Sequence, residues 1–178
     1  MIIIKYFVHG TSIDNELKIS SGWSQGELSE TGIIQTKKLA DEISDEHFDV
    51  IFCSDLHRAK QSADILFGHR SLEVIYDQRI RECNYGIYNG TTNKNVIYLD
   101  HINNRFPQGE SLLDVQRRIE ELLNEIKQKH REKKIAFVSH RAPQLALNVI
   151  INKKTWIEAV NNDWRIIGKW QSGWEFIL

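Results

Sequence analysis

Three short segments rich in apolar and β-branched residues constrain the fold of this chain. They are residues 2–8, 48–53 and 134–138, and none of them alternates cleanly between apolar and polar positions. This pattern is typical of strands that are covered on both faces, as in a parallel sheet. Helical patterns lie between them. We therefore predict a three-layer α/β/α sandwich with a mostly parallel central sheet and right-handed crossovers.

Apolar spacing and capping residues predict the helices. The clearest begins at Leu112, with Ser111 as N-cap and Asp114 as its capping partner. Another is predicted to begin at Pro143, because proline suits the first helical position, where its missing N–H is not needed. Two more are predicted at residues 31–43 and 57–66.

The last quarter of the chain is rich in tryptophan. The final five residues, WEFIL, predict a late strand. We predict that the tryptophans pack in the core or cover the edge of the sheet, because large amphipathic rings usually do so. They are Trp156, Trp164, Trp170 and Trp174.

Size and charge narrow the class of protein. A chain of 178 residues is enough for one domain over residues 1–178, with a small lid-like insertion at about 84–107. The net charge of −1 argues against nucleic acid as a partner. Cys53 and Cys83 lack CxxC spacing, and no apolar stretch reaches the roughly 18 residues of a membrane span. We expect a cytoplasmic protein without a membrane partner; its oligomeric state is left open.

Polar residues follow each of the three apolar segments. His9 and Gly10 follow the first, Arg58 comes soon after the second, and His140 and Arg141 follow the third. Because ligands bind beyond the carboxyl ends of parallel strands, we expect these residues to meet at one edge of the sheet. The helix after His140 would add free N–H groups there. This set of cations and imidazoles suits an anion of the phosphate type.

These residue types indicate phosphoryl transfer. A neutral imidazole at His9 can attack phosphorus directly, and Gly10 leaves room for close approach. Arg58 and His140 can stabilise the charge on the phosphoryl oxygens. A carboxylic acid must protonate the leaving alkoxide. We nominate Glu82, which lies in the loop-like stretch RIRECNYG.

Six motifs in register resemble the histidine phosphatase superfamily, the phosphoglycerate mutase-like enzymes. In chain order they read VHGTSIDN, GWSQGELSETGIIQT, CSDLHRAKQSA, IRECNYGIYNG, FPQGES and VSHRAP. The resemblance implies that His9 is the phosphorylated nucleophile, that Glu82 is the general acid and base, and that Asn15 contacts phosphate alongside Arg58 and His140. It also implies that no metal or organic cofactor is needed. A small phosphorylated metabolite or a phosphoprotein is the expected substrate.

Two residues depart from the family pattern. The family has arginine before the nucleophile, whereas this chain has Val8, so one guanidinium that faces the phosphoryl group is missing. Losing such a donor typically costs about 10²- to 10³-fold in rate. The family commonly has glycine after the second histidine, where this chain has Arg141. We hypothesise that Arg141 binds substrate and returns the missing charge.

Three alternatives to a phosphatase stay open. The first is a member of the same fold that binds phosphate with weak or no turnover, which Val8 favours. The second is a phosphoglycerate mutase, although only residues 84–107 could form a closing lid. The third is a serine hydrolase, because GWSQG fits the GxSxG motif and Ser24, Asp55 and His140 follow that triad's order.

Overall fold

The computed structural model describes residues 1–167, 170 and 172–178, and its centre is a five-stranded sheet. Its strands are β1 (Ile3–Val8), β3 (Val50–Cys53), β4 (Val74–Tyr76), β6 (Lys134–Ser139) and β7 (Trp174–Ile177). The order across the sheet is β4-β3-β6-β1-β7. The first four strands run parallel, and β7 pairs antiparallel with β1 at the edge. The three predicted inner strands and the late strand are thus present, whereas β4 was not predicted.

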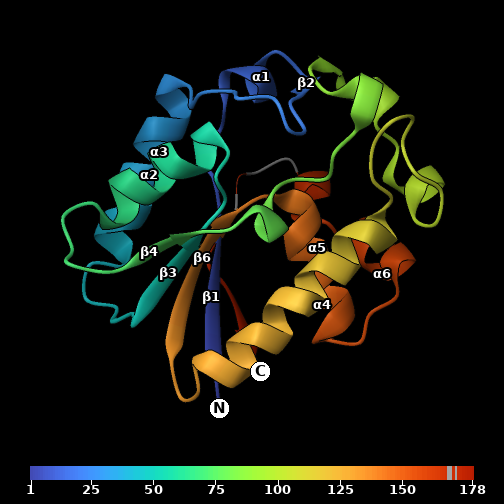
Figure 1. Ribbon diagram of the computed structural model, residues 1–178. Helices are drawn as coiled ribbons and strands as arrows, with labels where there is room; N and C mark the ends of the chain where they lie inside the picture. Colours follow the sequence, from blue (N-terminus) through green and yellow to red (C-terminus); the bar gives the residue numbers. More distant parts are fainter. Residues whose placement is uncertain (168–169, 171) are drawn as a thin grey trace.

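Helices cover both faces of the sheet (Figure 1). One face carries α2 (Glu30–Glu42) and α3 (His57–Phe67). The other carries α4 (Leu112–Lys129), α5 (Arg141–Ile150) and α6 (Trp156–Asn161). The predicted three-layer α/β/α sandwich with a mostly parallel sheet is confirmed.

Two apolar clusters fill the spaces between the layers. Along β1, Tyr6 and Val8 pack toward the α4 and α5 side, while Phe7 packs toward α2 and α3. In β6, Phe137 and Val138 divide in the same way. Alternate side chains of a strand point to opposite faces, so a strand that is apolar at every position can fill two clusters.

The register of the central strands determines where their last residues lie. Val8 of β1 is opposite Ser139 of β6, so His9 and His140 leave the sheet side by side. On the other side of β6, Cys53 of β3 is opposite Val138, which brings Ser54 to the same edge. This edge lies at the top of the sheet in Figure 1, opposite the chain termini.

Helix α5 begins two residues earlier than predicted. Ser111 and Asp114 do form the predicted capping box of α4. By contrast, α5 starts at Arg141, so Pro143 is its third residue and not its first. This position is also compatible with proline, because the first four N–H groups of a helix have no partner within it.

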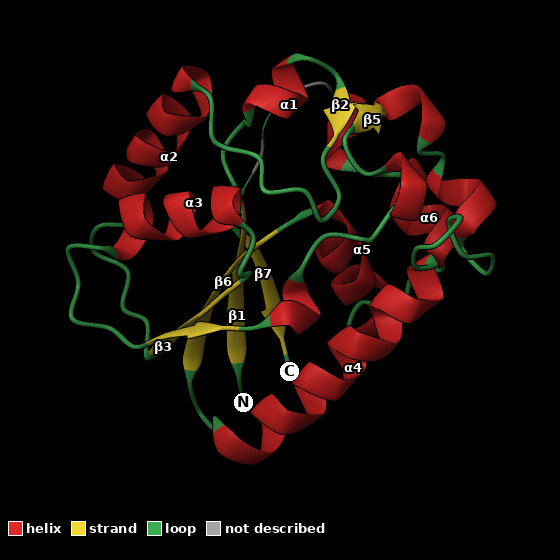
Figure 2. Cartoon of the chain, turned by 45° about the horizontal axis from the view of Figure 1, so that its top comes forward, coloured by secondary structure: helices red, strands yellow, loops and turns green. Residues whose placement is uncertain are grey.

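The segment at 84–107 consists of short 3₁₀ turns around a two-residue strand. Strand β5 (Thr91–Thr92) pairs with β2 (Ile19–Ser20), which follows the short helix α1 (Ile13–Glu16). Figure 2 shows this small sheet above the main sheet, beside α1. The 3₁₀ turns within the described residues are Gln78–Ile80, Gly86–Tyr88, Asn93–Asn95, Tyr98–His101 and Trp164–Ile167. That residues 84–107 act as a lid stays a prediction.

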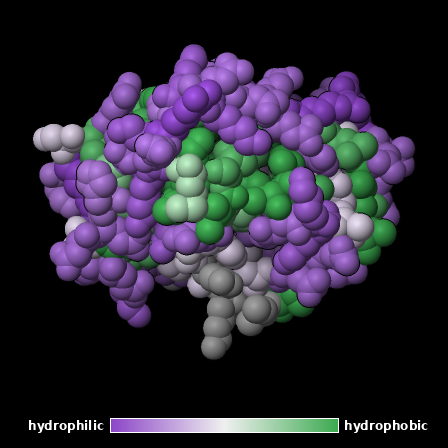
Figure 3. Space-filling model, turned by 90° about the horizontal axis from the view of Figure 1, so that it is seen from below, coloured by the Kyte–Doolittle hydropathy of each residue, from purple (hydrophilic) through white to green (hydrophobic). Residues whose placement is uncertain are grey.

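The end of the molecule near the chain termini has an apolar patch on its surface. Seen from below, apolar side chains gather in the middle of the face and hydrophilic ones surround them (Figure 3). Met1 and Ile177 are among the exposed apolar side chains of the chain. Across residues 1–167, 170 and 172–178, no helix is long and apolar enough to cross a bilayer.

Candidate active site

A cavity of about 260 Å³ lies where the central strands end. Its wall includes His9 after β1, Arg58 from the first turn of α3 and Glu82 from the loop after β4. Four cationic side chains line it, but Glu82 is the sole carboxylate among the lining residues that the structure describes. The four cations are Lys18, Arg58, Arg141 and Arg165. A site of this charge favours anionic ligands.

Hydrogen bonds at both ring nitrogens orient His9. Its Nδ1 lies 2.7 Å from the carbonyl oxygen of Gly10, and Nε of Arg58 donates to its Nε2 across 3.2 Å. A guanidinium can only donate, so Nε2 carries the lone pair and Nδ1 carries the proton. Burial, and then the charge of Arg58, lower the pKa of His9 well below its ordinary value. The ring is therefore neutral, with its unprotonated nitrogen toward Arg58.

Arg58 is almost fully buried, with 1% of its surface exposed. Besides His9, its guanidinium donates to the carbonyl oxygens of Ser24 at 2.9 Å and of Gly22 at 2.8 Å. Gly22 has φ of 52°, a backbone conformation that side chains disfavour. The turn at residues 22–24 therefore serves to hold the guanidinium beside His9.

His140 is fully buried beside His9, and the two ring centroids are 5.1 Å apart. Its Nε2 lies 2.8 Å from the hydroxyl oxygen of Ser54, which also accepts from Leu56 N–H. If the hydroxyl donates to Nε2, the ring proton is on Nδ1, which has no hydrogen-bond partner among the described residues. Burial, followed by Arg58, lowers the pKa of His140 well below its ordinary value. In that tautomer Nδ1 has a proton to donate, but His140 is not among the described residues that line the cavity.

Glu82 lies in the cavity wall and at the start of α5. Its Oε1 accepts from Cys83 N–H and Ala142 N–H, both at 2.9 Å, and Oε2 accepts from Arg141 N–H at 3.2 Å. The hydroxyl of Tyr98 donates to Oε1 across 3.3 Å. This corrects the expectation that the N–H groups of α5 are free for phosphate, because the first two are bound by Glu82.

Arg141 also reaches the cavity wall, but its guanidinium is paired. Its Nε donates to Oδ2 of Asp163, whose side chain is buried. The guanidinium carbon lies 4.1 Å from the centre of the Tyr98 ring, a cation–π distance. Arg141 is thus held on two sides.

The remaining predicted site residues differ in position. Asn15 lines the cavity, and its Oδ1 accepts from the N–H of Ser12 in the cap of α1. Gly10 is not one of the described residues that line the cavity. A Cβ at Gly10 would lie 2.5 Å from the Gly32 carbonyl oxygen and 2.5 Å from Thr36 Oγ1. The missing side chain leaves room for α2, whereas we expected it to leave room for the ligand.

The structure does not assemble the serine hydrolase triad. The GWSQG segment is a turn between β2 and α2, not a strand followed directly by a helix. Asp55 is bound by the guanidinium of Arg81, and His140 is bonded to Ser54, not to Ser24. The triad interpretation of Ser24, Asp55 and His140 is therefore wrong.

Several cavity residues were missed by sequence reasoning. Trp164 and Trp170 pack against the core, as predicted, and they also line the cavity, which was not predicted. Trp170 also donates from Nε1 to the carbonyl oxygen of His9 across 3.0 Å. Lys18 also lines the cavity. Its backbone has φ of 57°, which is unusual for a residue other than glycine, and no feature of the sequence indicates this conformation. Arg165 follows no predicted strand, so the edge rule could not find it.

Comparison with known proteins supports the resemblance to the histidine phosphatase superfamily. The profile of the histidine phosphatase superfamily (branch 1) matches residues 7–156. "Phosphoserine phosphatase 1" of Hydrogenobacter thermophilus is 33% identical over 149 residues, which are 78% of this chain and 71% of that protein. The "phosphoglycerate mutase" of Schizosaccharomyces pombe is 30% identical over 126 residues, 62% of this chain and 60% of that one.

Solved structures share the fold. A mycobacterial glucosyl-3-phosphoglycerate phosphatase aligns with a TM-score of 0.75 at 26% identity, covering 88% of this chain and 85% of the other. YhfR of Bacillus stearothermophilus aligns with a TM-score of 0.81 at 24% identity, covering 89% and 84%. The chain belongs to the histidine phosphatase superfamily, branch 1.

Proposed function

We propose that this protein is a phosphomonoester hydrolase that works through a phosphohistidine on His9. The observation that carries the proposal is the pair of bonds to the His9 ring, which leave Nε2 unprotonated beside Arg58. A nucleophilic nitrogen without its own proton needs no separate base. The cationic cavity around it suits the dianion that would be attacked.

The first half of the reaction transfers the phosphoryl group to His9. As substrate enters, the N–H of Arg58 moves from Nε2 to a phosphoryl oxygen, and His140 donates from Nδ1 to another. The P–O bond to the leaving group breaks as the N–P bond forms. Glu82, in its protonated form, gives its proton to the departing alkoxide, so an alcohol leaves.

The second half returns the enzyme to its starting state. The Glu82 carboxylate takes a proton from water while the water oxygen attacks phosphorus. The N–P bond breaks, inorganic phosphate leaves, and the lone pair returns to Nε2. Glu82 ends protonated, ready for the next substrate.

Hydrolysis of para-nitrophenyl phosphate, compared between wild type and His9→Ala, tests the proposal. We expect His9→Ala to lower turnover by on the order of 10⁴-fold or more, as removal of a nucleophile does elsewhere. His47→Ala is the matched control, because that side chain is 81% exposed. Rapid quenching should trap an acid-labile phosphoenzyme in wild type only. Equal turnover of His9→Ala and wild type contradicts the proposal.

A phosphate-binding protein with weak or no turnover is the second candidate, and Val8 in the cavity wall favours it. Tight phosphate binding without turnover of any phosphomonoester would support it. Mutase activity is a third possibility, since one relative is named a phosphoglycerate mutase. Transfer of the phosphoryl group to a second hydroxyl in place of water would reveal it.

A small phosphorylated metabolite suits a cavity of about 260 Å³ better than a phosphoprotein. Phosphoserine is the first substrate to test, because a relative with 33% identity is named a phosphoserine phosphatase. We also propose a cytoplasmic location. Two buried cysteines without a disulfide, Cys53 and Cys83, support it.

A further inference from the structure

The cavity has an apolar wall beside the nucleophile. Val8, the residue before His9, lines the cavity with 4% of its surface exposed. A valine offers neither charge nor a hydrogen bond to an anion at this position. The phosphoryl group would therefore meet Arg58 and His140 on one side and hydrocarbon at Val8, unless a cation from another segment reaches it.

Arg165 lines the same cavity as Val8 and His9. Its side chain is exposed, and within the described part of the chain its guanidinium makes no hydrogen bond or ion pair. The guanidinium carbon lies 5.6 Å from the centre of the Trp164 ring. A cation in a cavity wall that has no partner among the described residues is available to a ligand.

Hydrogen bonds anchor described residues of the C-terminal segment around Arg165. Before it, the buried carboxylate of Asp163 accepts the Arg165 N–H at 3.0 Å. After it, Trp170 donates to the His9 carbonyl oxygen, and Gly173 N–H donates to the backbone carbonyl oxygen of Tyr6 at 3.0 Å. Trp170 and Gly173 therefore lie beside the end of β1. Burial first, then Arg58 and also Arg165, lower the pKa of His9, consistent with the place of Arg165 in the cavity wall.

Arg141 is less suited to the same task. The carboxylate of Asp163 binds its Nε and the ring of Tyr98 covers its guanidinium. A paired guanidinium would have to lose these contacts before it could move to the phosphoryl group. The single carboxylate of Asp163 thus neutralises Arg141 with one oxygen and holds only the backbone of Arg165 with the other.

We propose that Arg165 binds the phosphoryl group and supplies the positive charge that Val8 does not. The inference rests on the proposed function only in taking this cavity as the phosphoryl site. Arg165 and Asp163 both lie beyond residues 7–156, the span that the family profile matches. The side chain therefore acts from the C-terminal segment, and not from the strand that carries the nucleophile.

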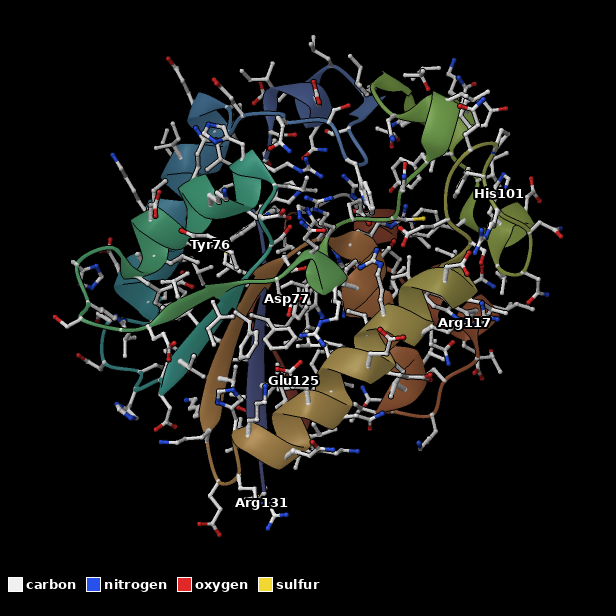
Figure 4. All side chains as sticks on the ribbon, viewed as in Figure 1. Tyr76, Asp77, His101, Arg117, Glu125 and Arg131 are labelled. Carbon is white, nitrogen blue, oxygen red and sulfur yellow. The ribbon has the colours of Figure 1, made fainter. Side chains whose placement is uncertain are left out.

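Calorimetric titration with inorganic phosphate tests the inference without requiring turnover. We expect Arg165→Ala to weaken phosphate binding by about 10- to 100-fold, the range for a charge-assisted hydrogen bond. Arg131→Ala is the matched control, because that exposed arginine lies at the far end of the molecule (Figure 4). We expect it to bind phosphate as wild type does. Adding Val8→Arg to Arg165→Ala should recover affinity to within about tenfold of wild type.

Salt separates direct contact from long-range attraction. At 1 M salt the screening length is about 3 Å, so a difference between Arg165→Ala and wild type that persists supports contact. A difference that disappears at 1 M salt overturns the inference, as does an affinity of Arg165→Ala within twofold of wild type. An equal loss in Arg131→Ala overturns it too. Because the titration measures binding alone, a protein without phosphatase activity leaves this test intact.

Discussion

Arg58 donates from Nε to Nε2 of His9 across 3.2 Å, and this bond determines which imidazole nitrogen is free of a proton. The other nitrogen lies 2.7 Å from the carbonyl of Gly10. The same guanidinium also favours the neutral ring, because a cation beside it opposes protonation. In the proposed reaction, Arg58 thus prepares His9 before substrate binds, and the N–H that it points at Nε2 would shift to a phosphoryl oxygen.

The two neutral imidazoles predict a loss of stability in mild acid. Burial is the first cause that lowers the pKa of both His9 and His140 in the folded protein, while unfolded histidine titrates near 6.5. Below that pH the unfolded chain binds more protons, so the stabilisation is present above pH 6.5 and is lost as pH falls. We expect the free energy of unfolding to fall by up to ~1.4 kcal/mol per pH unit for each histidine.

Urea denaturation at several pH values between 7.5 and 5.5 measures this slope. His9→Asn should reduce it, because one of the two depressed groups is removed. The Asp114 carboxylate does not confuse the result, since hydrogen bonding from Arg105 lowers its pKa far below this window. Stability that stays constant or rises from pH 6.5 to 5.5 would show that the imidazoles are not held neutral.

Arg58→Lys should separate charge from geometry. Lysine keeps the charge but cannot donate to His9 and to the carbonyls of Gly22 and Ser24 together. We expect turnover to fall about 10²- to 10³-fold, because a donor aimed at transition-state charge is lost. Each buried carbonyl left without a donor should lower the free energy of unfolding by ~1–3 kcal/mol.

Arg70→Lys is a matched control for that variant. Arg70 also donates to backbone carbonyls, those of Ile43, Ser44 and Glu46 after α2, and it does not line the cavity. It should lose stability in urea denaturation with kcat/KM unchanged. If Arg58→Lys behaves in the same way, Arg58 is a structural residue and not part of the reaction.

Gly10→Ala should disturb the fold at the start of the site. Its Cβ would lie 2.5 Å from the backbone oxygen of Gly32 in α2, which cannot move without shifting the helix. We expect a loss of roughly 1–3 kcal/mol in thermal or urea unfolding, as for other overpacked sites. Gly26→Ala is the control, since its Cβ would come close only to the flexible carboxylate end of Asp14 and would make an ordinary contact with the Ser21 hydroxyl oxygen. Similar stability of the two variants would argue against the packing explanation.

Local patterns predicted most of the fold. Uninterrupted apolar runs gave the strands β1, β3 and β6, and the Ser111–Asp114 pair gave the start of α4. Strand β4 was not predicted because its apolar run, Val74–Tyr76, is only three residues long. A short run is enough at the sheet edge, where these side chains are partly buried or exposed. The start of α5 was misplaced because its first N–H groups are capped by Glu82, a side chain from another loop. Such long-range capping leaves no local signal.

Some residues of the candidate site could likewise be predicted from the sequence, and others could not. His9, Arg58 and His140 come together because parallel strands end at one edge, which spacing along the chain can predict. Arg165 and Trp170 reach the cavity from the C-terminal segment, where hydrogen bonds to Asp163 and His9 hold them. Residues placed by such bonds follow no periodic pattern in the sequence, so only the structure could show that they line the cavity.

The proposed role of Glu82 as a proton donor predicts a dependence on the leaving group. An alkoxide needs a proton to depart, whereas para-nitrophenolate is stable enough to leave as an anion. We expect Glu82→Gln to lower kcat/KM by about 10²- to 10⁴-fold for an alkyl phosphate, and by much less for para-nitrophenyl phosphate. Glutamine would also place an NH₂ group among the N–H donors of Arg141 and Ala142, which disturbs the site for both substrates. The ratio of the two kcat/KM values cancels that shared effect, and a ratio equal to that of wild type would remove Glu82 from the proton-donor role.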